Sequence, residues 1–294
     1  MAESRADLVP PWTLAVAAMF SVQLASALAV PMIGDIGAPG TAWLRLTIGA
    51  LVFVLVQRPP LRALRRVDVP VVIALGIATG VMTVAFMEAL DRIPLGMAVA
   101  VEFLGPLTVA AARSPHRRAL VWPALALVGV VLMTEPWRGN VEVAGLAFAA
   151  LAGAGWGGYI LLTQRIGDRF SGIGSLSMTV PIAALTVAVV GVPQAASHLT
   201  PALLAEAAVL ALLMPVLPFV LELLALRRMT HTAFGTLMAL EPAIGLVWGA
   251  VLLDQTPSVG QLVGITVVVF AGAAAQRGGR RAPSETALAE VQPV

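Results

Sequence analysis

Residues 102–106 read EFLGP and place a carboxylate, Glu102, and a helix-breaking proline, Pro106, inside a long apolar run. A second such pair, Glu241-Pro242, lies in a similar run nearer the other end of the chain. In a membrane-spanning helix an acidic side chain is costly unless it is protonated, paired or facing water. Pro106 also deprives the carbonyl of Glu102 of its intrahelical hydrogen-bond donor. Both stretches are therefore candidates for a functional site at membrane depth.

The composition predicts a polytopic membrane protein. The 294 residues are 59% hydrophobic and only 12% charged, with a mean hydropathy of +0.92, which is too apolar for a soluble domain. The 18 basic residues are all arginines in short blocks between apolar runs, and this pattern argues against nucleic-acid binding. The chain has no cysteine and three scattered histidines, so we predict neither a metal site nor a cofactor.

Ten apolar runs have the length expected of membrane-spanning helices. They cover residues 12–33, 39–57, 69–90, 93–113, 119–136, 141–162, 173–191, 203–226, 231–253 and 258–276. The polar residues 277–294 that follow are predicted to form a disordered tail.

The arginines predict the orientation. With the amino terminus in the cytoplasm, only Arg92 and Arg138 fall in outer connections and Arg45 lies within a span, which leaves fifteen of the 18 in cytoplasmic segments. An even number of helices then places the carboxy terminus in the cytoplasm as well.

A repeat relates the two halves of the chain. ALDRIPLGMAVAVEFLGP (89–106) aligns with ALRRMTHTAFGTLMALEP (225–242). Because each half contains five helices, an odd number, the halves must insert in opposite senses. We therefore expect an all-α fold of ten transmembrane helices built as two inverted five-helix repeats, 1–137 and 138–276. The expected site is where the repeats meet, near the bilayer midplane.

Four polar residues within the spans are candidates for binding substrate or protons. Glu102 and Glu241 both lie close to the middle of their helices. Arg45 lies too deep for its head group to reach water easily, and it either binds a substrate carboxylate or forms a fixed ion pair with a glutamate. Gln23 is one of few strongly polar residues in the first span and either lines a cavity or bonds a neighbouring helix.

Two further glutamates have simpler explanations. Glu88 is spaced to pair with Arg92 at the outer membrane surface, a contact that contributes little stability. Glu222 lies about one turn from the inner end of its helix, where an ion pair with Arg227 or Arg228 and a functional role are equally consistent with the sequence.

The sixth span carries a second group of candidates. Gly153 and Gly157 form a GxxxG pair that allows a close helix contact. Trp156 and Tyr159 share a helix face and are candidates for the wall of a polar cavity. Gln164 lies near the inner end, as a site residue or an interface residue.

The chain resembles the EamA branch of the drug/metabolite transporter superfamily, and within it the threonine and homoserine exporters. The strings that carry the resemblance are SVQLASALA, GAPGTAWLRLTIGALVF, IPLGMAVAVEFLGPLTVA, AGAGWGGYILLTQRIG, LPFVLELLAL and TAFGTLMALEPA, which together touch six of the ten spans. Two departures are Gly157-Gly158, where bulkier residues are common, and Asp254, where Gly-Glu is usual. The residues that match polar positions of the family are Gln23, Arg45, Glu102, Tyr159, Gln164, Glu222 and Glu241.

The resemblance implies a ten-helix inverted repeat in a bacterial plasma membrane, the inner membrane of a Gram-negative cell. It also implies export of small neutral amino acids or related metabolites, coupled to protons. The alternatives are a facilitator without proton coupling, an exporter of other metabolites or drugs, and a membrane scaffold without transport activity. An enzyme is not expected, because no nucleophile, base or metal set is present. The sequence favours no particular oligomeric state.

Overall fold

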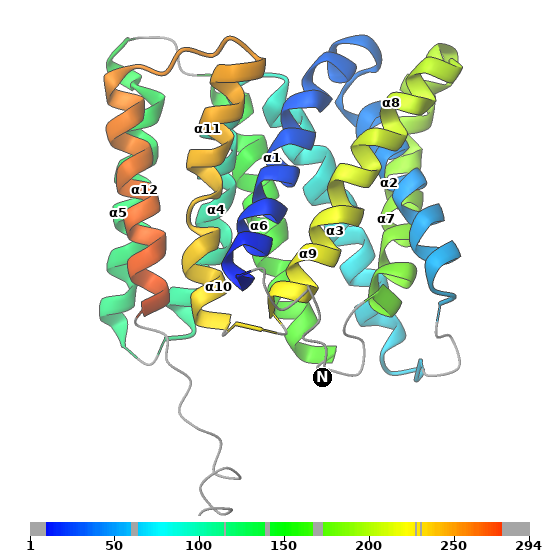
Figure 1. Ribbon diagram of the computed structural model, residues 1–294, viewed down its shortest axis with the longest axis horizontal. Helices are drawn as coiled ribbons and strands as arrows, with labels where there is room; N and C mark the ends of the chain where they lie inside the picture. Colours follow the sequence, from blue (N-terminus) through cyan, green and yellow to red (C-terminus); the bar gives the residue numbers. More distant parts are fainter. Residues whose placement is uncertain are drawn as a thin grey trace, which may run out of the picture.

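The computed structural model describes residues 10–59, 64–114, 116–138, 142–166, 173–226, 228–229 and 231–277. These residues form an all-helical bundle without strands (Figure 1). The α-helices are α1 (Pro11–Ile36), α2 (Ala38–Val56), α3 (Val69–Leu90), α4 (Leu95–Ala112), α5 (Val121–Thr134), α6 (Val143–Ile166), α7 (Ile173–Ala195), α8 (Pro201–Ala211), α9 (Leu217–Leu226), α10 (His231–Met238), α11 (Glu241–Leu252) and α12 (Val259–Arg277).

The predicted polytopic membrane character is confirmed. Nine segments of the described chain are long and apolar enough to cross a membrane, and a tenth apolar helix, Val259–Ala275, is shorter. Each of the ten predicted ranges overlaps one of these segments. The tail predicted over 277–294 lies outside the described residues, apart from Arg277 at the end of α12.

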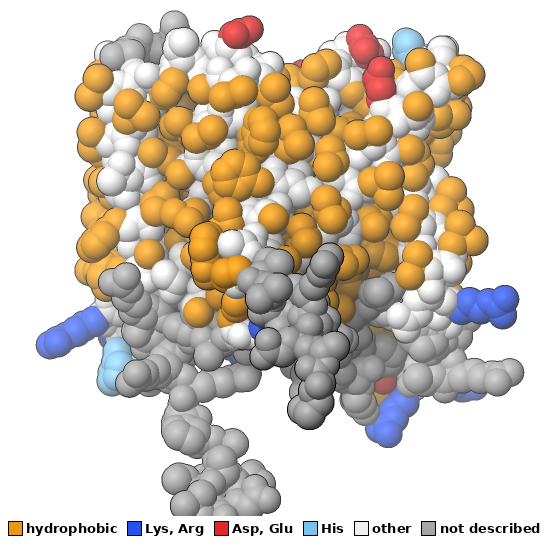
Figure 2. Space-filling view, in the orientation of Figure 1, with side chains coloured by type: hydrophobic (Ala, Val, Ile, Leu, Met, Phe, Trp, Pro, Cys, Tyr) orange, Lys and Arg blue, Asp and Glu red, His pale blue; other side chains and the backbone are white. Residues whose placement is uncertain are grey.

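Much of the apolar surface faces outward. Leu55 and Leu185, for example, are 83% and 72% exposed. Figure 2 shows hydrophobic side chains over the whole middle of the molecule, with arginines at the lower rim and acidic side chains at the upper rim. Such a surface suits hydrocarbon rather than water.

Prolines mark where several helices begin. Pro11, Pro39, Pro70, Pro201 and Pro242 each occupy the first turn of a helix. The missing N–H of proline costs nothing there, because the first N–H groups of a helix have no intrahelical acceptor. These residues therefore set the starts of α1, α2, α3, α8 and α11.

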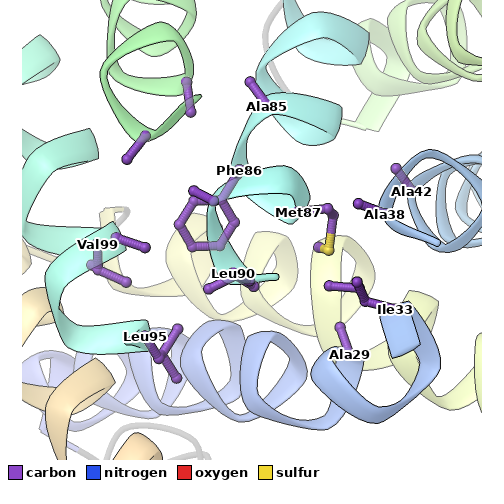
Figure 3. Packing of buried hydrophobic residues seen from close by; sticks show 14 of the residues in the cluster. Ala29, Ile33, Ala38, Ala42, Ala85, Phe86, Met87, Leu90, Leu95 and Val99 are labelled. Carbon is purple, nitrogen blue, oxygen red and sulfur yellow. The ribbon is translucent and has the colours of Figure 1, made fainter. Parts of the chain in front are cut away.

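The helices pack in pairs through small side chains. α2 packs on α7, α5 on α12, and α4 on both α6 and α11. α3 packs on α6 and α7, while α9 packs on α1 and α8 on α2. Figure 3 shows one layer of this core, in which Phe86 and Leu90 of α3 lie toward Val99 and Leu95 of α4. On the other side of α3, Met87 lies toward α1 and α2.

Two of the predicted spans are interrupted, which corrects the prediction that 203–226 and 231–253 are single helices. Between α8 and α9 lies a distorted segment, Leu212–Val216, in which Met214 is extended with φ −158° and ψ 118°. Between α10 and α11 the helix stops before Glu241-Pro242. Both breaks coincide with a proline, which cannot continue the hydrogen-bond ladder. By contrast, α4 continues through Pro106.

Candidate functional site

The break between α8 and α9 is the first part of the site. Backbone groups freed inside a membrane need other partners, because no lipid atom can bond them. The hydroxyl of Ser21 on α1 donates to the carbonyl oxygen of Leu213 at 2.7 Å. Gly49 of α2 leaves room for the break, since a Cβ there would come within 3.3 Å of Pro215. α1 and α2 thus hold the break between them.

Arg45 on α2 lies one turn before Gly49 and reaches the same break. Its side chain is 3% exposed, and its Nη1 donates to the sulfur of Met214 at 3.8 Å. A thioether is a weak acceptor, whereas a guanidinium offers five N–H donors. Among the described residues no carboxylate forms an ion pair with Arg45. The fixed ion pair considered from the sequence is thus not found there, and the buried guanidinium lacks a strong partner.

Three glutamates on different helices have charges that interact with one another or with Arg45. Glu102 of α4 is partly buried, and its charge interacts with that of Arg45. Glu241 is 6% exposed and interacts electrostatically with both Glu102 and Glu222. These four residues, Arg45 of α2, Glu102 of α4, Glu222 of α9 and Glu241 of α11, are called the buried group below.

Glu241 is also the first residue of α11. The amino-terminal end of a helix carries a partial positive charge and unpaired N–H groups, which favour a negative group nearby. The break before Glu241 therefore places a helix terminus beside its carboxylate inside the membrane, an arrangement that suits transporter sites.

The close contact predicted for the GxxxG pair of α6 is confirmed, and its partner is the EFLGP stretch of α4. A Cβ on Gly153 would lie 2.6 Å from the carbonyl oxygen of Glu102. A Cβ on Gly157 would lie 3.5 Å from the carbonyl oxygen of Gly105. The carbonyl of Glu102, which Pro106 leaves without an intrahelical donor, therefore faces Gly153 of α6. The carboxyl group is then the polar group of Glu102 that remains for contacts with a substrate or a proton.

The comparisons with known proteins agree with this membrane architecture. Residues 143–274 match the model of the EamA-like transporter family. The threonine/homoserine exporter RhtA of Escherichia coli strain K12 is 34% identical over 269 residues, which cover 89% of each chain. The exporter of the same name from Salmonella typhimurium strain LT2 is 34% identical over 274 residues, covering 90% of this chain and 91% of the relative.

The chain belongs to the EamA-like transporter family. A crystal structure of a protein with 20% sequence identity matches this EamA-like transporter with a TM-score of 0.62, over 92% of this chain and 99% of that one. At this identity the likeness concerns the fold alone.

The other predicted site residues of the EamA-like transporter are distributed around this centre. Trp156 packs with the main core, whereas Tyr159 packs with a smaller cluster formed by α3 and α7. Tyr159 is also electrostatically coupled to Glu222. Gln23 is 2% exposed and lies between α1 and α11. The side chain of Gln164 lies outside the described part of α6.

The ion pair predicted between Glu88 and Arg92 is confirmed, with Nη1 and Oε2 2.5 Å apart. Arg92 also lies 5.1 Å from the centre of the Phe148 ring. Both charged side chains retain partial exposure, 30% for Arg92 and 18% for Glu88, so this pair is separate from the buried group. The alternative pairing of Glu222 with Arg227 lies outside the described residues.

Sequence reasoning missed two hydrogen bonds at the upper end of the bundle in Figure 1. There Gln194 accepts a hydrogen bond from the amide of Gly40 at 3.1 Å, at the start of α2. Gln255 accepts one from the amide of Leu95 at 3.1 Å, at the start of α4. Both glutamines belong to the second half and cap helices of the first half. Gln194 lies in the last turn of α7 and Gln255 follows α11, and the sequence around them carries no motif that predicts this role.

Two residues that make contacts at the break were also missed. Ser21 and Met214 contact the backbone and the guanidinium there, but neither was a candidate. Pro215, in the middle of an apolar run, was the available signal for an interrupted helix. The residues on both sides of Pro215 are apolar, so the run was predicted as one continuous span.

Proposed function

We propose that this protein exports small neutral amino acids of the threonine and homoserine type, or closely related metabolites, from the bacterial cytoplasm. The observation that carries the proposal is Arg45, a buried guanidinium that donates a hydrogen bond to the thioether sulfur of Met214. A substrate carboxylate would replace that weak contact with two parallel charge-assisted hydrogen bonds. The names of the curated relatives, threonine/homoserine exporters, support this substrate class.

The charge balance supports a role for protons. With Glu102, Glu222 and Glu241 all ionised, the buried group would carry more negative than positive charge, with Arg45 as its cation. Uncompensated charge in a low-dielectric interior is unfavourable. Either protons or the ammonium group of an amino acid would correct this balance. We propose that Glu102 and Glu241 exchange protons for the substrate ammonium group, which couples export to the proton gradient.

The packing supports two inverted halves, 1–137 and 138–276. The pairs α2 and α7, α5 and α12, and α4 and α11 each join equivalent helices of the two halves. Two further pairs of contacts also exchange: α3 on α6 corresponds to α9 on α1, and α3 on α7 corresponds to α8 on α2. A twofold axis in the membrane plane would produce this pattern. We propose ten spanning helices, with α12 as the tenth.

The arginine distribution supports cytoplasmic termini and an inner-membrane location in a Gram-negative cell. Exposed arginines lie at the lower rim in Figure 2, which we assign to the cytoplasm. The upper end, where Gln194 bonds Gly40 and Gln255 bonds Leu95, then faces outside. We infer that this conformation is closed to the outside, and that alternating access requires these contacts between the halves to break.

The test is transport by purified protein in proteoliposomes loaded with labelled threonine, homoserine, valine or glutamate, with and without a pH gradient. We expect efflux of the two hydroxylated amino acids, faster with the gradient, and slow efflux of glutamate. Efflux that ignores an imposed pH difference would contradict proton coupling, and no efflux of any amino acid by folded protein would contradict the substrate class.

Matched variants assign the coupling residues. Glu102→Gln and Glu241→Gln keep the shape of the side chain but remove its proton exchange. We expect each to abolish the effect of the pH gradient. Glu88→Gln is the control, because Glu88 pairs with Arg92 outside the buried group.

A further inference from the structure

Two of the buried polar atoms that have no hydrogen-bond partner in the described part of the chain belong to α1 and α11, and the mechanism above does not use them. One is Oε1 of Gln23, whose side chain is 2% exposed. The other is Nε1 of Trp248 on α11. Leaving a buried polar group unpaired is unfavourable, so each such atom needs an explanation.

The two side chains both contact the opposite helix at the α1–α11 interface. A Cβ on Gly245 would lie 3.3 Å from Oε1 of Gln23, and Gly245 precedes Trp248 by three residues on α11. Phe20, three residues before Gln23 on α1, packs edge-on against the Trp248 ring, with 6.2 Å between the ring centroids. The interface also lies one helical turn beyond Glu241, because Gly245 follows it by four residues.

The chemistry of the two atoms is complementary. The indole nitrogen of Trp248 is a donor only, and the amide oxygen of Gln23 is an acceptor. They do not bond each other in this conformation. A hydroxyl group satisfies both at once, because it accepts one hydrogen bond and donates another.

We propose that Gln23 and Trp248 form the subsite that recognises the side-chain hydroxyl of the exported amino acid. This inference rests on the proposed function and names the residues that set its specificity. The carboxylate lies at Arg45 and the ammonium group faces Glu102 and Glu241. The hydroxyl reaches between α1 and α11, which separate slightly to admit it. An analogue without the hydroxyl leaves both atoms unpaired and is transported less well.

The test compares threonine and homoserine with 2-aminobutyrate, which is the analogue of both that lacks the hydroxyl. Rates are measured in proteoliposomes for the parent, Gln23→Leu and Trp248→Phe. We expect the parent to prefer the hydroxylated substrates. Gln23→Leu should lower the ratio of threonine to 2-aminobutyrate rates about tenfold, the effect of losing one buried hydrogen bond. Trp248→Phe, which keeps an aromatic ring, should lower the ratio in the same direction.

Ser26→Ala is the matched control. Ser26 is fully buried on the same helix, but its hydroxyl already donates to the carbonyl of Val22 at 2.9 Å, so the substrate ratio should not change. If Gln23→Leu and Trp248→Phe slow all three substrates equally, the two atoms serve packing or bind water, and the subsite is wrong. If the folded parent carries none of the three, the proposed function itself fails.

Discussion

The side-chain oxygen of Gln255 accepts a hydrogen bond from the backbone amide of Leu95, at 3.1 Å, and thereby ties the second half of the chain to the first. Leu95 is the first residue of α4, where backbone amides have no intrahelical acceptor. The bond therefore satisfies an amide that would otherwise lack an acceptor at the upper end of the bundle in Figure 1. A movement that separates the start of α4 from Gln255 would break it.

Replacing Gln255 should shift the protein toward a state that is open to the outside. Because the chain has no cysteine, Met97→Cys gives a unique reporter at a residue that is 8% exposed near Gln255. We expect Gln255→Leu to accelerate its labelling by a membrane-impermeant maleimide in intact cells severalfold. Gln194→Leu, which removes the bond to Gly40, should act in the same direction.

Gln261→Leu is the control for this measurement. Gln261 lines the same small cavity as Gln255, but its side-chain oxygen bonds the amide of Ser258, within the first turn of α12. The variant thus removes a glutamine without removing a contact between the halves. Equal labelling rates in the Gln255 and Gln261 variants would mean that Gln255 does not restrain the outer end.

Arg45→Lys should lose most export activity although it keeps the positive charge. A lysine ammonium cannot form the two parallel bonds that a guanidinium makes with a carboxylate. We expect export rates to fall at least about tenfold, the cost of one strong hydrogen bond, for every amino-acid substrate alike. Arg92→Lys, at the exposed ion pair, should leave the rate nearly unchanged. Efflux assays in proteoliposomes measure both; retention of full activity by Arg45→Lys would exclude a bidentate site.

Gly153→Ala should destabilise the protein by pushing α6 away from α4. The added methyl group would meet the carbonyl oxygen of Glu102 at 2.6 Å, and such overpacking typically costs about 1–3 kcal/mol. Gly158→Ala is the matched control on the same helix, because a Cβ there has no neighbour within 4 Å. Thermal unfolding in detergent compares the two variants. Equal unfolding midpoints would show that α4 and α6 move apart at little cost in stability.

Ser21→Ala should weaken the join between α1 and the break in α8–α9. The carbonyl of Leu213 would lose the donor that now lies 2.7 Å away, at a cost of about 1–3 kcal/mol if no other donor replaces it. Protease sensitivity near residues 212–216 in detergent should rise. Thr266→Val, whose hydroxyl bonds its own helix at Leu262, should show no such change.

Hydropathy predicted the positions of the spans because membrane insertion requires long apolar runs whatever their neighbours. The buried group was predicted in part: Arg45, Glu102 and Glu241 stood out because charge is rare at that depth. Their neighbours could not be derived, since helix rotation and tertiary contact decide that the carbonyl of Glu102 meets Gly153. The same reasoning explains why Ser21 and the capping glutamines were missed, because their partners are backbone atoms of distant helices.

The two mid-span breaks, before Glu241 and at Leu212–Val216, both lie in the second half, whereas the described spans of the first half are uninterrupted. The halves therefore differ in mechanical compliance. An unbroken helix has a fixed length and adjusts by tilting as a whole, while two jointed segments also shorten or lengthen along the bilayer normal by changing the angle between them. A thinner bilayer would then be accommodated by α8–α9 and α10–α11. Export rates that do not vary with lipid chain length would contradict the idea that α8–α9 and α10–α11 adjust to bilayer thickness.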